Sequence, residues 1–294
     1  MISNENYNEV KSHGSSKTKS YRVALTIAGS DSSGGAGIQA DIKTFSALGV
    51  YGATAITAIT AQNTVGVHSQ CALDPQMVYD QICAVVDDLH PQVVKIGMLS
   101  NNDIVTAVAE ALAKYHLSII LDPVMISTSG HRLLSEDAQE ALKRHLLPLA
   151  TLVTPNIPEM MALTAMPLTT FEDKHRAAHH LMEYGATSVL LKGGHEEGNT
   201  KSDVLFSSSP SGIVSTIFSS PTVHTRNTHG TGCTLSAAIA AFMARGASMS
   251  DAIAEAKCYL TEALRLGADV TVGSGFGPVN HGFNPIKMII NDGE

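Results

Sequence analysis

Short apolar runs alternate with stretches of helical periodicity from Tyr21 onward. The apolar runs predict buried strands at Arg22–Ala28, Thr54–Thr60, Val93–Met98, Ser118–Asp122, Thr151–Thr154 and Ser188–Lys192. The stretches between them predict helices at Ala36–Leu48, Asn102–Tyr115, Ser135–His145 and Phe171–Tyr184. Strands that are separated by helices predict a parallel sheet covered by helices on both faces.

The pattern changes after Lys192. Two short runs at Asp203–Phe206 and Ile213–Ile217 are separated by Ser, Pro and Gly and predict a hairpin. Two long helices follow, near Thr231–Arg245 and Ser250–Gly267, and then a loop at Gly273–Asn280. Because no linker is long enough to divide the chain, we expect a flexible tail at residues 1–20 and a single domain over residues 21–294.

Composition and charge narrow the class of protein. The chain has 294 residues, of which 44% are hydrophobic and 16% charged, so it can bury a large core. The net charge of −8 argues against a nucleic-acid surface, which needs a clustered basic face. No apolar run approaches the roughly 18 residues of a membrane helix, and the four cysteines form no CxxC motif. We therefore expect a cytoplasmic protein that binds neither nucleic acid nor membrane.

A glycine-containing segment, NTHGTGCT at residues 227–234, precedes the first of the two long helices. Gly230 and Gly232 let the backbone approach a ligand closely, and the free N–H groups of a helix N-terminus favour an anion such as a phosphate. Taken alone, the motif is more typical of an ordinary loop in which a Thr caps the helix, and only the wider sequence context favours the anion site. His229 lies inside this loop, and the sequence does not decide whether it orients the loop.

Polar side chains follow three predicted strands, where parallel sheets bind their ligands. Asp122 follows one strand, and Asn156 and Glu159 follow the next. Oxygen ligands of this kind suit Mg²⁺, although each residue could instead serve a turn or a helix cap. Lys192 ends a further strand before two glycines, and it could reach nucleotide phosphates or be a solvated surface lysine.

The first strand and first helix are joined by a loop at residues 29–37, with sequence GSDSSGGAG. Gly35, Gly37 and Ala40 fit a relaxed dinucleotide fingerprint, but no Asp or Glu lies between Asp41 and Asp74 to bind a ribose. The chain also has no GxxxxGK[ST] motif, which excludes a P-loop. A loop that encloses a substrate fits better.

Taken together, these motifs resemble the hydroxymethylpyrimidine/phosphomethylpyrimidine kinases of the ribokinase superfamily. The resemblance runs from about Val23 to His281. It rests on ALTIAGSDSSGGAGIQAD at residues 24–41, TAITAQNTVG at 57–66, KIGML at 95–99, LDPVM at 121–125, TPNIPE at 154–159, LKGGH at 191–195 and NTHGTGCT at 227–234. It implies a three-layer α/β/α fold with a mainly parallel central sheet and a small lid or none.

The resemblance also implies roles for individual residues. Gly29, Asp41, Gln62 and Met98 correspond to residues that surround the pyrimidine in the family. The catalytic segment is Gly230, Thr231, Gly232 and Cys233, and Lys192, Asn156 and Thr228 would bind ATP while Asp122 and Glu159 support Mg²⁺.

Cys233 is diagnostic of the family, because most ribokinase relatives carry Asp there as the base for the substrate hydroxyl. A thiol at a helix N-terminus should have a lowered pKa, although a small cysteine that only packs is the alternative.

The implied activity is ATP-dependent phosphorylation of 4-amino-5-hydroxymethyl-2-methylpyrimidine and of its monophosphate, which supplies the pyrimidine half of thiamine. We expect a homodimer that acts on this small molecule. The sequence leaves open whether both phosphorylation steps occur. Two rivals are a pyridoxal or pyridoxine kinase of the same fold and a nucleotide-binding regulatory protein without turnover.

Overall fold

The computed structural model describes residues 19–126, 130, 133–194 and 198–291. Within these residues nine strands form one sheet in the spatial order β10-β9-β8-β7-β6-β5-β2-β3-β4. The six strands in the middle are parallel, while β4 at one edge and β9 and β10 at the other pair antiparallel. The bounds are β2 Val23–Asp31, β3 Tyr51–Gln62, β4 Val67–Ala72, β5 Val93–Ile96, β6 Ser118–Leu121, β7 Leu152–Val153, β8 Ser188–Leu191, β9 Thr200–Ser209 and β10 Gly212–Pro221.

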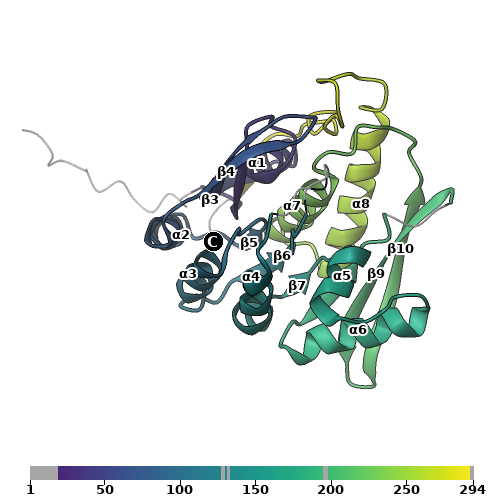
Figure 1. Ribbon diagram of the computed structural model, residues 1–294. Coiled ribbons are helices and arrows are strands. Elements are labelled where there is room, and N and C mark those ends of the chain that lie inside the picture. Colours follow the sequence, from purple (N-terminus) through teal and green to yellow (C-terminus); the bar gives the residue numbers. More distant parts are fainter. Residues whose placement is uncertain (1–18, 127–129, 131–132, 195–197, 292–294) are drawn as a thin grey trace, which may run out of the picture.

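Helices cover both faces of this sheet (Figure 1). One face packs against α1, α7 and α8, and the other packs against α2 to α6. Side chains alternate between the two cores along each strand, so Ala24 of β2 faces the first layer and Leu25 the second. The bounds are α1 Gly37–Ala47, α2 Pro75–Leu89, α3 Asn102–Leu112, α4 Glu136–Ala141, α5 Ile157–Thr164, α6 Phe171–Glu183, α7 Thr231–Ala244 and α8 Met249–Arg265. The expected three-layer architecture with a mainly parallel sheet is confirmed.

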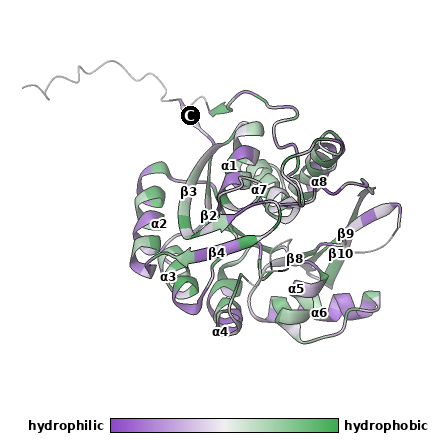
Figure 2. Ribbon diagram, turned by 45° about the horizontal axis from the view of Figure 1, so that its top comes forward, coloured by the Kyte–Doolittle hydropathy of each residue, from purple (hydrophilic) through white to green (hydrophobic). Residues whose placement is uncertain are grey.

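The α7 helix is enclosed along most of its length. Every residue from Thr234 to Ala241 is buried, and the helix is pale to green in Figure 2. A helix that is apolar on all sides must be covered on all sides. Here the sheet, α1 and α8 cover it, which fixes the position of its N-terminus at the carboxyl edge of the sheet.

The order of the strands explains where a ligand can bind. The chain passes from β2 to β3 on one side of β2, and then continues with β5 on the other side. In open parallel sheets, a crevice forms beyond the strand ends at such a switch point. The motifs that follow β2, β5, β6, β7 and β8 therefore meet at one edge of the sheet.

The expected hairpin after Lys192 is confirmed as β9 and β10, which pair along their whole length. Among the described strands of the nine-stranded sheet and the α-helices, three were not predicted from the sequence: α2, β4 and α5. The α2 helix carried a readable signal, because Asp74 caps it, Pro75 occupies its first turn, and Val78, Ile82 and Val86 recur every four residues on its buried face. In the part of the chain that the structure describes, no helix has the length and apolar character needed to cross a membrane.

The two ends of the described chain lie together. β1 (Ser20–Tyr21) pairs antiparallel with β11 (Ile290–Asn291), and the ring of Tyr21 stacks on that of Tyr51. Residues 1–18 of the expected tail lie outside the described residues, as does His195 of the LKGGH segment.

Candidate active site

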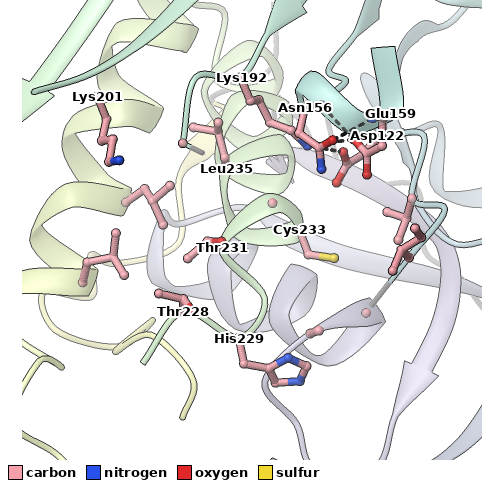
Figure 3. A pocket seen from close by; sticks show the side chains of 18 of the residues that line it. Asp122, Asn156, Glu159, Lys192, Lys201, Thr228, His229, Thr231, Cys233 and Leu235 are labelled. Atoms are coloured by element: carbon pink, nitrogen blue, oxygen red, sulfur yellow. Dashed lines mark hydrogen bonds and ion pairs between the residues drawn. The ribbon is translucent and has the colours of Figure 1, made fainter. Parts of the chain in front are cut away.

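A cavity of about 690 Å³ opens at the carboxyl edge of the sheet. One wall is the first turn of α7, and the opposite wall carries the polar side chains that follow β6, β7 and β8 (Figure 3). A third part of the lining comes from the loop after β2 and from the ends of β3 and β5. The predicted site residues that line it are Gly29, Gln62, Met98, Asp122, Asn156, Glu159, Lys192, Thr228, Thr231, Gly232 and Cys233.

The N-terminus of α7 is built on Gly230, which is its N-cap residue and has a φ of 80°. A Cβ atom at this position would lie 1.9 Å from the carbonyl oxygen of Gly35, so only glycine fits both the backbone conformation and the contact. No described side chain caps the first turn of α7, so Thr231 is not the cap. The N–H of Thr231 donates to the carbonyl oxygen of Thr228 at 3.3 Å, whereas the N–H groups of Gly232 and Cys233 are left for an anion in the cavity.

Facing this turn is a cluster of two carboxylates and one ammonium group. Lys192 Nζ lies 2.7 Å from Asp122 Oδ1 and 3.7 Å from Glu159 Oε2. The Lys192 side chain is 12% exposed, so it is not a solvated surface lysine. Asp122 also accepts hydrogen bonds of 3.2 Å from Thr154 and from Ser236. These contacts hold the Asp122 carboxylate in one orientation at the cavity wall.

The charges of the cluster are unbalanced. Burial and the nearby Asp122 carboxylate raise the pKa of Glu159 to about 7, although Lys192 works in the opposite direction. Burial also disfavours the charged form of Asp122, but the ammonium groups of Lys192 and Lys95 outweigh burial and hold its pKa below the ordinary value. Two carboxylates thus share one close cation, and an added divalent cation would relieve their repulsion. The donor set fits Mg²⁺, which takes one or two carboxylates together with waters and phosphates.

No group of three His, Cys, Asp or Glu side chains within the described ranges could hold a metal ion by itself. This agrees with a Mg²⁺ site that depends on ligands from water and nucleotide. Asn156 and Glu159 additionally form a capping box for α5, with reciprocal hydrogen bonds of 2.8 Å. Their cap role and their position at the cavity wall are therefore compatible.

Cys233 is in the first turn of α7 and lines the cavity, but the expected lowering of its pKa is wrong. Although part of its surface is exposed, protein surrounds the thiol closely, and this burial raises its pKa to about 11. The ammonium group of Lys95 and the backbone N–H of Gly37 favour the thiolate without compensating for burial. The thiol is therefore protonated at neutral pH in this structure.

Gly29, Met98 and Gln62 come from β2, the loop after β5 and the end of β3, and they meet at one side of the cavity. A Cβ atom on Gly29 would lie 2.9 Å from the sulfur of Met98, so glycine is needed for their close packing. Thr60 lies beside them, 3.1 Å from the side-chain amide of Gln62. This corner combines an apolar wall with an amide that can both donate and accept hydrogen bonds.

Of the four residues expected to surround the pyrimidine, only Asp41 does not line the cavity. It is fully buried in α1, and both of its oxygens accept hydrogen bonds from Lys95 Nζ, at 3.0 and 2.8 Å. Thr26 donates a third hydrogen bond of 2.6 Å. Burial alone would lower the pKa of Lys95, but the Asp41 carboxylate outweighs burial and raises it above its ordinary value. Asp41 thus holds a buried cation behind the cavity wall.

A second buried ion pair supports the side of the cavity that carries Lys192. Asp203 of β9 contacts Lys257 of α8 at 2.6 Å and accepts a 2.9 Å hydrogen bond from the backbone N–H of Gly193. This arrangement fixes the backbone directly after Lys192. Neither this pair nor Lys95 was predicted from the sequence, because no local pattern shows which buried charges will meet across the fold.

Comparison with known proteins identifies the family. The family model described as phosphomethylpyrimidine kinase matches residues 31–280. The chain belongs to this family. A hydroxymethylpyrimidine/phosphomethylpyrimidine kinase from Salmonella typhimurium is 48% identical over 260 residues, which cover 88% of this chain and 96% of that protein.

Solved structures agree with this assignment. A phosphomethylpyrimidine kinase from Clostridium difficile superposes with a TM-score of 0.72 at 43% identity and covers 82% of this chain and 99% of its own. A pyridoxal kinase from Staphylococcus aureus in complex with pyridoxal superposes with a TM-score of 0.81 at 31% identity, and covers 92% of this chain and 98% of its own. The expected ribokinase-like kinase fold and the use of ATP follow from membership in the family.

Proposed function

We propose that the chain transfers the γ-phosphate of ATP to the hydroxymethyl group of 4-amino-5-hydroxymethyl-2-methylpyrimidine, and then phosphorylates the monophosphate. Through these steps it would supply the pyrimidine half of thiamine. The observation that carries the proposal is a single cavity in which Gly29, Gln62 and Met98 stand beside the uncapped N-terminus of α7, opposite Lys192. A small ring and the phosphates of a nucleotide can therefore meet at the first turn of α7.

Phosphoryl transfer passes through a loose transition state, so positioning and charge stabilisation carry most of the catalysis. The N–H groups of the first turn of α7 would bind the negative charge of the transferring group. Lys192, held by Asp122, would bind phosphate oxygens from the other side. Asn156 and Thr228 line the same cavity and would contact the nucleotide.

Asp122 and Glu159 would hold Mg²⁺, directly or through water. When bound, the ion neutralises phosphate charge. The raised pKa of Glu159 means that this carboxylate must lose a proton before it can act as a ligand.

Cys233 is the group proposed to take the proton of the substrate hydroxyl. It can accept a proton only as a thiolate, and its pKa of about 11 leaves most of the protein in the thiol form at neutral pH. The buried ammonium of Lys95 is the nearby charge that favours the thiolate. Because positioning and charge stabilisation carry most of the catalysis of a loose phosphoryl transfer, turnover does not require a large thiolate fraction.

A second candidate substrate is pyridoxal, because the pyridoxal complex from Staphylococcus aureus has a closely similar fold. Both rings carry a hydroxymethyl group, so the first turn of α7 could serve either. The corner formed by Gly29, Gln62 and Met98 favours the aminopyrimidine, since the Gln62 amide matches a ring nitrogen with an adjacent amino group.

We also propose that the protein acts in the cytoplasm as a homodimer. All four cysteines are unpaired, which suits a reducing compartment. Sedimentation at micromolar concentration would test the dimer, and a monomer at all concentrations would refute it.

A substrate panel tests the proposed function. ATP turnover is measured with hydroxymethylpyrimidine, its monophosphate, pyridoxal and ribose under the same conditions. We expect kcat/KM to be highest for hydroxymethylpyrimidine and far lower for ribose. Equal or higher turnover on ribose would refute the assignment, and a preference for pyridoxal would replace the substrate while keeping the reaction type.

A further inference from the structure

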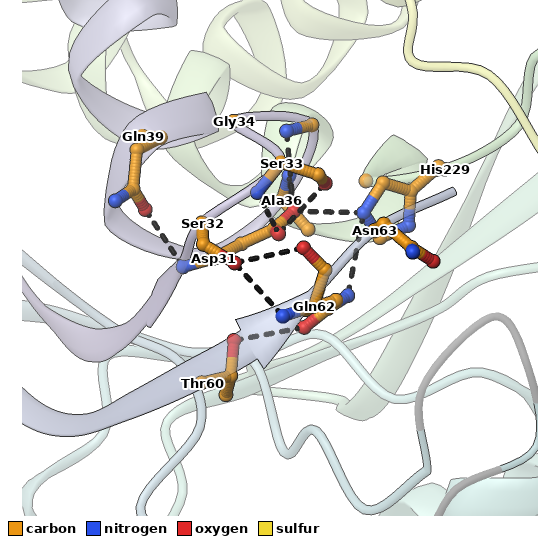
Figure 4. Close-up of polar contacts among 12 residues, drawn as sticks. Asp31, Ser32, Ser33, Gly34, Ala36, Gln39, Thr60, Gln62, Asn63 and His229 are labelled. Atoms are coloured by element: carbon orange, nitrogen blue, oxygen red, sulfur yellow. Dashed lines mark hydrogen bonds and ion pairs between the residues drawn. The ribbon is translucent and has the colours of Figure 1, made fainter. Parts of the chain in front are cut away.

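Asp31 and His229 form a buried hydrogen-bonded pair between segments that lie 198 residues apart (Figure 4). His229 Nε2 lies 2.8 Å from Asp31 Oδ2, and the two side chains are 7% and 3% exposed. The same carboxylate accepts hydrogen bonds from the backbone N–H groups of Ser33, Gly35 and Ala36. Asp31 therefore holds the whole loop after β2 in place and joins it to the segment before α7.

Asp31 is ionised in this arrangement. Burial acts to raise its pKa, but the hydrogen bonds from His229 and Ser33 outweigh burial and lower the pKa to about 2. An ionised carboxylate can only accept hydrogen bonds, so His229 Nε2 must carry a hydrogen and donate it.

This assignment determines how the Gln62 side chain is oriented. Thr60 lies 2.8 Å from the carbonyl oxygen of Ser30, which can only accept, so the one hydroxyl hydrogen of Thr60 is used there. Toward the Gln62 amide, 3.1 Å away, Thr60 can therefore only accept. The other end of the amide lies 3.4 Å from His229 Nε2, whose single N–H is directed mainly at Asp31 and presents its positive end to this side of the amide. The consistent arrangement has the amide nitrogen toward Thr60 and the amide oxygen toward His229, since the reverse would oppose two N–H donors.

The backbone of Gln62 is fixed as well. Its N–H donates to the hydroxyl of Ser32 at 2.8 Å, and its carbonyl oxygen accepts from the same hydroxyl at 2.7 Å. The His229 ring packs on Gly35, where a Cβ atom would lie 2.4 Å from the ring carbon Cδ2. The ring thus has one position, which is set by the loop that Asp31 organises.

We propose that His229 is a positioning residue for ring recognition. Held by Asp31, it fixes the orientation of the Gln62 amide, and it connects the loop after β2 to Gly230 at the start of α7. This inference rests on the proposed function. With its nitrogen toward Thr60, the amide has one N–H and one oxygen lone pair left for a ligand. An N–H beside a carbonyl oxygen matches a ring nitrogen beside an exocyclic amino group, which an aminopyrimidine has and pyridoxal lacks.

Three variants test this role. His229→Leu removes the donor while keeping a side chain of similar size, and His229→Gln restores an N–H at a comparable distance from the backbone. His179→Leu is the matched control, because His179 is exposed on α6, away from the cavity. For each variant, kcat and KM are measured for hydroxymethylpyrimidine, pyridoxal and ATP, together with Tm.

We expect His229→Leu to lower kcat/KM for hydroxymethylpyrimidine by about 10- to 100-fold, as for loss of a hydrogen bond to a charged group. The loss for pyridoxal should be several-fold smaller, and KM for ATP should stay within about twofold. His229→Gln should recover most of the loss, and His179→Leu should match the wild type. Equal losses for both rings, or no rescue by His229→Gln, would overturn the inference.

Thr60→Val provides a second route if His229→Leu does not fold. It removes the acceptor for the amide nitrogen and leaves the Asp31–His229 pair intact, so it should narrow the preference for hydroxymethylpyrimidine over pyridoxal. An unchanged preference in Thr60→Val would contradict the assigned amide orientation. A wild-type protein that turns over neither ring would refute the proposed function itself, whereas normal wild-type selectivity with unaffected variants would refute only the role of His229.

Discussion

Gly232 offers a substitution that should separate activity from stability. It is the second residue of α7, and a methyl group there would lie 3.5 Å from Lys192 Nζ and 3.7 Å from Asp122 Oδ2. Both are ordinary van der Waals distances, so the fold can accept Gly232→Ala. Replacing glycine by alanine at a compatible position stabilises a protein by about 0.4–1 kcal/mol. With about 2.1 cal/mol/K of unfolding entropy per residue, the Tm should rise by about 1–2 °C.

The same methyl group should be costly for catalysis. It would stand between the first-turn amides of α7 and Lys192, in the space where the proposal places the phosphates. Loss of one donor to a developing negative charge typically costs about 10²–10³-fold in kcat, and we expect a loss of that size. Steady-state turnover of hydroxymethylpyrimidine with ATP and a thermal melt measure the two effects on the same sample.

Gly282→Ala is the matched control. A methyl group on Gly282 would meet no described atom within 4 Å, and the residue lies outside the 690 Å³ cavity. Activity should therefore stay close to wild type, while Tm should rise by about the same 1–2 °C as in Gly232→Ala. A Gly232→Ala protein with activity within a few-fold of wild type and an unchanged KM for ATP would refute the placement of the phosphates at α7.

Three other predictions concern charged or titrating groups. Because the pKa of Glu159 is about 7, protons should compete with Mg²⁺ for this carboxylate below pH 7. The Mg²⁺ concentration that gives the half-maximal rate should therefore fall as pH rises from 6 to 8, and Glu159→Gln should abolish this dependence. Lys95→Met should lower the free energy of unfolding, measured by denaturant melts, by about 3–5 kcal/mol, because it leaves the Asp41 carboxylate buried without its cation. Adding Asp41→Leu should restore much of this loss. If Cys233 is the base, kcat/KM should rise up to tenfold per pH unit toward about 11, and Cys233→Ser should remove that rise; a flat wild-type profile would contradict the role.

The architecture was predictable because it depends on patterns that are local in the chain. Buried parallel strands are continuous apolar runs, and the helices between them have their own periodicity, so β2, β5, β6 and β8 were found at nearly their observed positions. The exposed strand β4 was not predicted, because five of its six residues face solvent and the segment contains no apolar run. Its pairing with β3 is a property of the sheet edge, which a local pattern does not record.

The site was predictable where chemistry follows directly after a strand or precedes a helix. The rule that ligands bind beyond the carboxyl ends of parallel strands pointed to Asp122, Asn156, Glu159 and Lys192, and all four line one cavity. This rule could not predict the contact between Asp31 and His229, because the contact depends on how a loop near one end of the chain packs on a loop near the other end. Such long-range contacts can be recognised only once the topology has brought the segments together.

Cys233 shows how magnitudes decide between a local rule and the tertiary environment. A helix N-terminus favours a negative charge by only about 0.3–1 kcal/mol at an exposed position. Enclosing that charge in protein costs more than this unless a partner compensates, and the pKa of Cys233 rises to about 11 accordingly. Lys95, the cation that favours the thiolate, is itself engaged by both oxygens of Asp41. If Cys233 is the base, Asp41 acts on it from behind the cavity wall: by holding Lys95 charged and in place, Asp41 controls how much positive potential reaches the thiol.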